Sequence, residues 1–165
     1  MRTYRSQSGF TLMELMIVAA VLAVLMMAAV PIYQDYVNTA RANTHIDNFD
    51  EAKRLVAAEC AKSLAGGVEV NIVTELNDGN PASKRAVGNE NQPAFVDGAA
   101  TGTEATDAGV IYINGLAAGQ VSPGTPITIS AGALAVGTTP AHYRTRDAAG
   151  APGLPANYQE PCPAG

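Results

Sequence analysis

The feature that most constrains this chain is an apolar run near its start that contains a single carboxylate. The run extends from Phe10 to Val30, and Glu14 interrupts it after four residues. About 20 apolar residues are enough to cross a bilayer as a helix. A charge near the centre of such a helix costs roughly 2.5–3.5 kcal/mol on insertion scales, so it marks a functional site with a partner. No basic residue inside the run can be that partner.

The residues before the run predict its orientation in a membrane. Arg2 and Arg5 form a short positive head, which the positive-inside tendency keeps in the cytoplasm, so the rest of the chain faces outward. A cleaved secretory signal peptide has a similar head, so cleavage near Ala29 is an alternative. A better small-residue site, Gly9, lies before the run, and cleavage there leaves the apolar segment on the mature protein.

These residues resemble the leader and N-terminal helix of bacterial type IV pilins and of the related pseudopilins. The matching features are a basic leader ending in Gly9, the stretch Phe10-Thr11-Leu12-Met13-Glu14-Leu15, a further apolar stretch, and then Pro31, Tyr33 and Tyr36. The short leader and the phenylalanine at the new terminus are more similar to the type IVa branch than to type IVb. Close matching covers about the first 36 residues.

The resemblance implies a processing and assembly pathway. Residues 1–9 would be a class III leader, which prepilin peptidase would remove between Gly9 and Phe10 before methylating the amine of Phe10. Residues 10–30 would be a transmembrane and filament-core helix. Glu14 would then pair with the Phe10 amine of a neighbouring subunit, which agrees with the rule that a buried charge must be paired.

One position departs from the family pattern. Many members carry a glycine midway through the helix, where this chain has Ala23. Glycine is worse than alanine in a helix by roughly 1 kcal/mol, so alanine removes an intrinsic weak point. Pro31 remains, and because proline removes a backbone donor and clashes with the preceding turn, we expect a kink or local melting there. A gentle kink with no function is equally open.

Residues 31–65 predict an amphipathic continuation of the same helix. Apolar residues recur at helical spacing along one face, and Gly66-Gly67 is a typical helix end. The apolar positions are Ile46, Phe49, Val56, Cys60 and Leu64.

The remaining residues, 66–165, predict a small antiparallel β-sheet head that covers this apolar face. Strand candidates are found at 68–73, 109–114 and 126–130, with weaker ones at 133–136 and 142–144. Residues 77–107 predict a variable surface loop with one short strand near 94–96, and the chain ends in an irregular tail. The predicted fold class is α+β, with a long N-terminal helix packed against the sheet. Type IV pilins have a similar architecture.

Two cysteines, Cys60 and Cys162, predict one disulfide. An exported chain meets an oxidising compartment, where two cysteines pair by default. Cys60 lies on the apolar face of the helix, and Cys162 lies in a proline-rich tail that we expect to stay outside the sheet and to need a tether. Many pilins place both cysteines near the C-terminus, so this pattern departs from the family. Two free thiols are the alternative.

Neither catalysis nor direct nucleic-acid binding finds support in the sequence. His45 and His142 are isolated, and a lone histidine is usually a surface or capping residue, so no metal site or cofactor is expected. Removing residues 1–9 changes the net charge from −5 to −7. The basic clusters Lys84-Arg85 and 144–146 are short, and are typical of solvated surface rather than of a phosphate-binding track.

The sequence therefore predicts a non-enzymatic pilin subunit that forms a homopolymer. The resemblance implies a single-pass inner-membrane protein with a cytoplasmic N-terminus before assembly, and an extracellular pilus afterwards, with prepilin peptidase and pilus assembly machinery as partners. One alternative is a minor pilin or a type II secretion pseudopilin, although the C-terminal acidic cluster for the calcium loop of the major pseudopilin is missing from the sequence. A membrane-tethered periplasmic binding protein or adhesin is another. The sequence leaves open whether a filament serves adhesion, twitching motility, DNA uptake or secretion.

Overall fold

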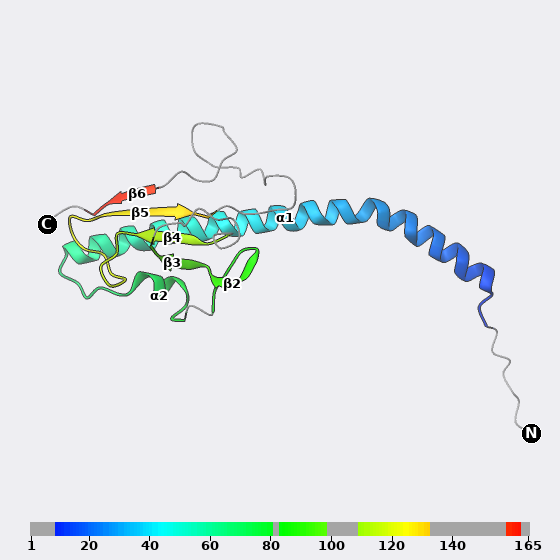
Figure 1. Ribbon diagram of the computed structural model, residues 1–165, viewed down its shortest axis with the longest axis horizontal. Helices are drawn as coiled ribbons and strands as arrows, with labels where there is room; N and C mark the ends of the chain where they lie inside the picture. Colours follow the sequence, from blue (N-terminus) through cyan, green and yellow to red (C-terminus); the bar gives the residue numbers. More distant parts are fainter. Residues whose placement is uncertain (1–8, 81–82, 99–108, 133–157, 163–165) are drawn as a thin grey trace, which may run out of the picture. The chain divides into compact units, whose positions relative to one another are not determined.

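The computed structural model describes residues 9–80, 83–98, 109–132 and 158–162. The chain divides into two compact units, Met1–Val37 and Asn38–Gly165. The elements, most of which are labelled in Figure 1, are α1 (Leu12–Leu64), α2 (Ile72–Leu76), β1 (Arg85–Ala86), β2 (Asn89–Pro93), β3 (Phe95–Asp97), β4 (Ile111–Asn114), β5 (Pro126–Ala131) and β6 (Tyr158–Pro161).

The long helix α1 has 53 residues and confirms the helix predicted from the apolar run and its amphipathic continuation. It ends as the glycines indicated. Gly66 takes a positive φ of 74°, its amide donates to the Ser63 carbonyl at 3.0 Å, and the Gly67 amide donates to the Lys62 carbonyl at 3.0 Å. This pair of hydrogen bonds is the Schellman arrangement, which satisfies carbonyls that the last helical turn leaves open.

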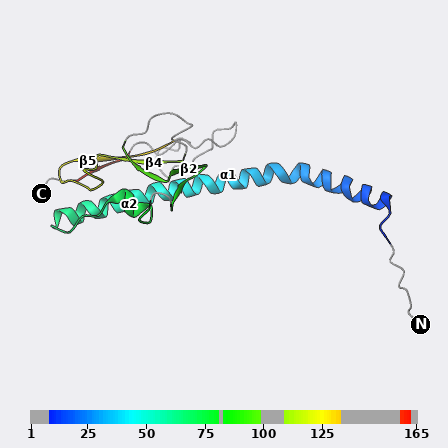
Figure 2. The same cartoon turned by 60° about the horizontal axis from the view of Figure 1, so that its bottom comes forward.

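The head unit is built on the second half of α1, and Figures 1 and 2 show its sheet running alongside that part of the helix. Phe49, Val56 and Cys60 are buried in the core, as predicted, together with Ala52. Ile46 is half-buried. Leu64 was predicted to face the core but is 42% exposed, because it lies in the last turn, where the chain leaves the helix.

The main sheet has four strands in the order β3-β4-β5-β6. The strands predicted at 109–114 and 126–130 are confirmed as β4 and β5, which pair antiparallel with Ile113 opposite Ile129. Ile111, Ile113, Ile127 and Ile129 are fully buried in the cluster that contains Val56 of α1. The α+β fold class is confirmed, but the sheet is mixed rather than antiparallel, because β3 runs parallel to β4.

The prediction of a strand at residues 68–73 is wrong. Val68 is 84% exposed, and Ile72 begins the short helix α2 instead. The Asn71 side chain caps this helix by accepting a hydrogen bond from the Thr74 amide at 2.9 Å. Capping by asparagine stabilises a helix start and outweighs the period-two alternation of the preceding residues.

The region predicted as a long loop contains more structure than expected. The short strand near 94–96 is confirmed as β3, but β1 and β2 form a hairpin that the sequence did not predict. Gly88, at φ 85°, completes its two-residue turn. Ala86 of the hairpin joins Val110 and Tyr112 in a second small apolar cluster. Residues 81–82 and 99–108 of this region lie outside the described residues.

The C-terminal tail also differs from its prediction. Tyr158–Pro161 forms β6 and pairs antiparallel with β5, so the tail joins the sheet despite its prolines. Proline is tolerated at the end of an edge strand, and Pro161 occupies such a position, opposite Pro126. The weaker strand candidates at 133–136 and 142–144 lie outside the described residues.

Candidate assembly site on the N-terminal helix

Helix α1 begins with a polar cap directly after Phe10. Thr11 precedes the first helical residue, and its hydroxyl oxygen accepts a hydrogen bond from the Glu14 amide at 3.2 Å. A threonine followed three residues later by a glutamate is the capping-box pattern, in which the two side chains serve the open amides of the first turn. The sequence prediction missed this cap, although Thr11 and Glu14 give its signal. Glu14 can therefore contribute to the helix cap as well as pair with a cation of another subunit.

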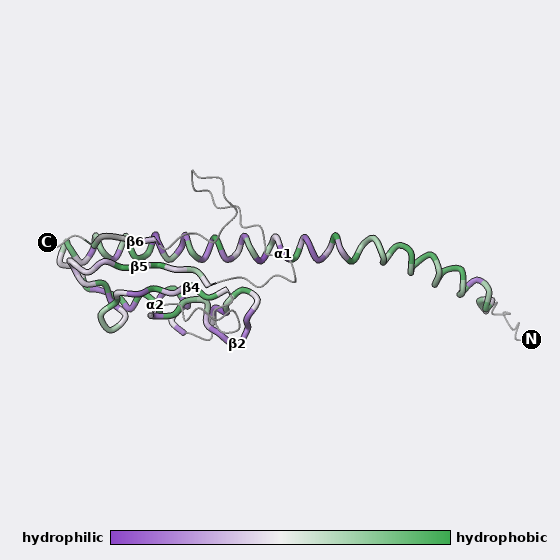
Figure 3. Tube along the Cα trace, turned by 45° about the horizontal axis from the view of Figure 1, so that its top comes forward, coloured by the Kyte–Doolittle hydropathy of each residue, from purple (hydrophilic) through white to green (hydrophobic). Residues whose placement is uncertain are grey.

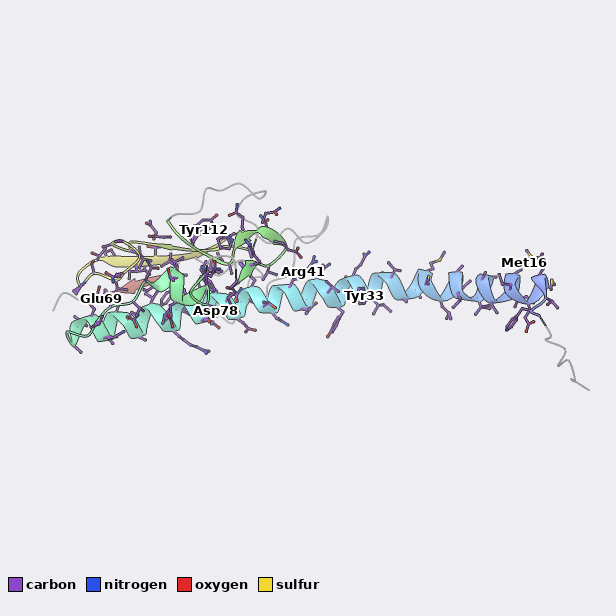
Figure 4. All side chains as sticks on the ribbon, turned by 90° about the horizontal axis from the view of Figure 1, so that it is seen from below. Met16, Tyr33, Arg41, Glu69, Asp78 and Tyr112 are labelled. Atoms are coloured by element: carbon purple, nitrogen blue, oxygen red, sulfur yellow. A yellow bond between two sulfur atoms is a disulfide. The ribbon has the colours of Figure 1, made fainter. Side chains whose placement is uncertain are left out.

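The first part of α1 presents an apolar surface on all sides. From Phe10 to Tyr36 every described side chain is exposed, including Phe10 at 84%, Leu12 at 80% and Met27 at 82%. Figure 3 shows this part of the helix as mostly hydrophobic, and Figure 4 shows Met16 projecting from it. By length and composition the helix could cross a membrane, and a signal sequence near an N-terminus has the same length and composition. The described part of the N-terminal unit, residues 9–37, thus contains apolar surface without a core of its own to bury it.

Glu14 is the only charged side chain between Phe10 and Gln34. It lies in the first turn of α1, four residues after Phe10. A carboxylate in the first turn is favoured by the helix dipole, and when the surrounding surface leaves water it becomes an acceptor for a cation. Gly9 and Phe10 precede the helix in an exposed segment. Pro31 lies inside α1, which continues through it, and the kink there stays a prediction.

The two predicted disulfide cysteines are brought together in the head. Cys60 of α1 and Cys162 after β6 form a disulfide across 102 residues, with a Cα–Cα distance of 5.5 Å, and each is 4% exposed. The tail has further attachments nearby. The Gly124 amide donates to the Cys162 carbonyl at 3.0 Å, and the Lys53 ammonium lies 4.5 Å from the centre of the Tyr158 ring. The disulfide therefore fastens an edge strand to the helix rather than holding a free tail.

His45 was predicted to be a surface or capping residue, and this is wrong. It is 1% exposed, and its Nε2 lies 3.2 Å from the Gly132 carbonyl, to which it donates in the neutral form. Burial lowers the pKa of His45, and backbone hydrogen bonds at Gly132 and Gly109 oppose that shift in part. Its burial depends on a contact 87 residues away, which no local pattern indicates. His142 lies outside the described residues.

Charged side chains of the head gather in a groove between α1 and α2 of about 650 Å³. Arg54 is the basic residue in its lining, whose other members include Asp47, Asp50, Glu51, Glu75 and Asp78. Lys84 pairs with Glu51 and lies over the Phe95 ring, so its charge is used within the head. Within the described ranges no three metal-ligating side chains are grouped suitably for an ion. The basic residues at 144–146 lie outside those ranges.

Comparison with known proteins identifies the apolar segment. A family model described as the prokaryotic N-terminal methylation motif matches residues 4–30. A fimbrial protein of Dichelobacter nodosus is 32% identical over 134 residues, which cover 70% of this chain and 73% of that protein. This chain belongs to the type IV pilin family. The predicted family is therefore confirmed, and the pseudopilin and tethered binding-protein alternatives are not favoured.

Other relatives of this pilin match over less of their length. A type IV major fimbrial protein FimA of Dichelobacter nodosus is 32% identical over 106 residues, which cover 61% of this chain and 56% of the relative. Here the chain spans little more than half of the relative's length. A second FimA protein of that organism is 35% identical over 113 residues, with 61% of each chain covered. No solved structure gave a significant match.

Proposed function

We propose that this pilin is a structural subunit that polymerises into a type IV pilus after removal of residues 1–9. In this proposal prepilin peptidase cuts between Gly9 and Phe10 and methylates the Phe10 amine. Before assembly the subunit is a single-pass inner-membrane protein with a cytoplasmic N-terminus. The pilus assembly machinery then transfers it to an extracellular filament. The subunit itself performs no reaction, so adhesion, motility or DNA uptake would depend on the filament and its partners.

The observation that carries the proposal is the position of Glu14 on an exposed apolar helix. Lipid surrounds that surface before assembly, and the helices of neighbouring subunits would surround it afterwards. Glu14 follows Phe10 by four residues, which is an axial distance of about 6 Å at 1.5 Å per residue when the helix of the mature subunit extends to Phe10. A neighbour displaced by this distance brings its Phe10 amine beside the carboxylate. Pairing in a dry core favours this axial register over others, because an unpaired charge there is costly.

Glu14→Gln tests whether the charge or the cap matters. Glutamine can also complete a capping box, so this variant retains the local role and loses the charge. We expect filament numbers to fall at least tenfold, since breaking a buried pair costs about 3–5 kcal/mol. Electron microscopy gives the filament count, and immunoblotting of the membrane fraction gives the amount of subunit.

Two further variants complete this experiment. Glu14→Leu should insert into the membrane at least as well as the native chain and should also fail to assemble. Thr11→Ala is the matched control, because it weakens the helix cap by about 1 kcal/mol and leaves the charge in place. It should still form filaments. Normal filaments from Glu14→Gln, or equal losses in Glu14→Gln and Thr11→Ala, would remove the assembly role of the charge.

The mature N-terminus tests the processing step separately. Mass spectrometry of subunits from sheared filaments should find a chain that begins at N-methylated Phe10. Replacing Gly9 with a bulky residue should leave unprocessed precursor in the membrane. A chain that begins after Ala29, or one that retains Met1, would contradict this step.

A further inference from the structure

The boundary between the apolar and polar parts of α1 carries two exposed tyrosines. Tyr33 is 69% exposed and Tyr36 is 72% exposed, and they follow the aliphatic residue Ile32. Figure 4 shows Tyr33 projecting away from the helix. Residues three positions apart are neighbours on a helix surface, so the two rings lie on one side of α1.

The described tyrosines of the head are placed differently. Tyr112 is 7% exposed in the cluster with Ala86 and Val110, and Tyr158 is half-buried beneath Lys53. These rings contribute to packing within the head. Tyr33 and Tyr36 instead expose most of their surface at a place where the neighbouring side chains change from aliphatic to polar, beginning with Gln34 and Asp35.

The spacing of the two tyrosines from the start of α1 matches the layers of a bilayer. At 1.5 Å per residue, Tyr33 lies about 32 Å and Tyr36 about 36 Å along α1 from its first residue, Leu12. The hydrocarbon core of a bilayer is about 30 Å thick, and about 40–45 Å with both headgroup layers. When Leu12 is at the inner edge of the hydrocarbon, Tyr33 lies just outside the outer edge, and Tyr36 lies near the outer limit of the headgroup layer.

We propose that Tyr33 and Tyr36 bind the phospholipid headgroup layer of the outer leaflet and fix the depth of the subunit before assembly. The inference rests on the proposed function, because it requires that the apolar helix spans the membrane. Tyrosine suits this layer because its apolar ring can contact the lipid chains while its polar hydroxyl contacts the hydrated headgroups. The same depth keeps Glu14 just inside the inner edge of the hydrocarbon, close to the Phe10 end where its partner has to arrive.

Tryptophan fluorescence can measure this depth, because the chain has no tryptophan of its own. The full-length chain would be reconstituted at low density in vesicles of phosphatidylethanolamine and phosphatidylglycerol, with lipids brominated either near the headgroup or near the chain end. Tyr33→Trp and Tyr36→Trp are the test variants. Val21→Trp reports the centre of the span and Asn43→Trp reports the aqueous side, and both positions are exposed.

Quenching by the two lipids gives a clear expected pattern. Tyr33→Trp and Tyr36→Trp should be quenched more by the headgroup-proximal bromine than by the deep one, and Val21→Trp should show the reverse order. Asn43→Trp should respond to neither. The result for Tyr33→Trp and Tyr36→Trp should not change with protein density. Three results would overturn the inference. The tyrosine-site variants could be quenched like Asn43→Trp, or like Val21→Trp, or only when subunits are crowded and contact each other.

A second measurement tests whether the tyrosines set the depth or only occupy the layer. Tyr33→Ala and Tyr36→Ala, introduced together into the Val21→Trp chain, should reduce the contrast between deep and shallow quenching. Tyr33→Phe with Tyr36→Phe is the matched control and should retain more of that contrast, because the rings remain. An unchanged contrast in the alanine chain would overturn the anchoring role.

The design separates this inference from the proposed function. If Val21→Trp is not quenched by the deep bromine, the helix does not span the bilayer, and both the membrane step and this inference fail. If Val21→Trp is deep while Tyr33→Trp and Tyr36→Trp avoid the headgroup layer, only this inference fails. Filament formation is scored separately by electron microscopy.

Discussion

Ile17 and Ile129 are the same residue type in opposite settings. Ile17, in the N-terminal unit, is 55% exposed on α1, whereas Ile129 of β5 is fully buried between the helix and the sheet. The head buries a core of aliphatic residues internally and adds a disulfide. The N-terminal unit presents its aliphatic residues outward, and burying them requires lipid or other subunits. Changes in the head should therefore alter the stability of one subunit, and changes in the N-terminal unit should alter association.

Loss of the Cys60–Cys162 disulfide should give the largest change in the stability of the head. For a loop of about 100 residues the chain-entropy model gives a stabilisation of up to about 4.7 kcal/mol, and measured losses are commonly 2–5 kcal/mol. Cys60→Ala with Cys162→Ala avoids a free thiol. Urea unfolding of the full chain in detergent should show an earlier midpoint for the head and unchanged helical signal from the micelle-embedded segment.

Reductant supplies the matched control for this prediction. It should destabilise the native chain in the same direction and leave the double variant unaffected. Equal midpoints for the native chain and the double variant would mean that β5–β6 pairing alone holds the C-terminal strand.

Truncating one isoleucine in each unit tests the comparison directly. Ile129→Ala should destabilise the head by about 2–5 kcal/mol, because it removes buried contacts and leaves a cavity. Ile17→Ala removes the same atoms from an exposed position and should change head stability by less than about 0.5 kcal/mol. Thermal unfolding of both full-length variants in detergent measures the difference. Similar losses in the two variants would show that the units are not energetically separate.

The parts of the fold that were predictable from sequence have strong local signals. Alternating isoleucines predicted β4 and β5, and a glycine pair predicted the end of α1. The disulfide followed from the number of cysteines and the expected compartment. The candidate assembly site was predictable because Glu14 is the one carboxylate in an apolar run. Cleavage after Gly9, methylation of Phe10 and pairing of Glu14 stay predictions.

The parts that were missed depend on contacts or on competing local preferences. The prolines of the tail argued against a strand, but Pro161 ends β6 at the edge of the sheet, where the ladder tolerates a residue without a donor. The alternation at 68–73 was overridden by the Asn71 cap of α2. His45 is buried by a partner 87 residues away, and a single histidine in a helix carries no sign of such a contact.

The smallest expected effect concerns this buried histidine and the pH dependence of head stability. Because burial lowers the pKa of His45 in the folded head, the unfolded chain binds more protons in the range below 6.5. The contribution of His45 to the free energy of unfolding should therefore be constant above about pH 6.5. Below that pH it should fall as the pH decreases toward the pKa of the folded state. The slope from one histidine is at most about 1.4 kcal/mol per pH unit.

Urea unfolding at several pH values between neutral and mildly acidic would measure this slope. His45→Gln should reduce it, although the variant starts from a lower stability because the contact with the Gly132 carbonyl changes. His142→Gln is the matched control, since the chain has only these two histidines, and it should retain the slope. If the slope disappears in His142→Gln and persists in His45→Gln, the buried histidine is not its source. The N-terminal unit contains no histidine, so a slope that disappears in His45→Gln belongs to the head.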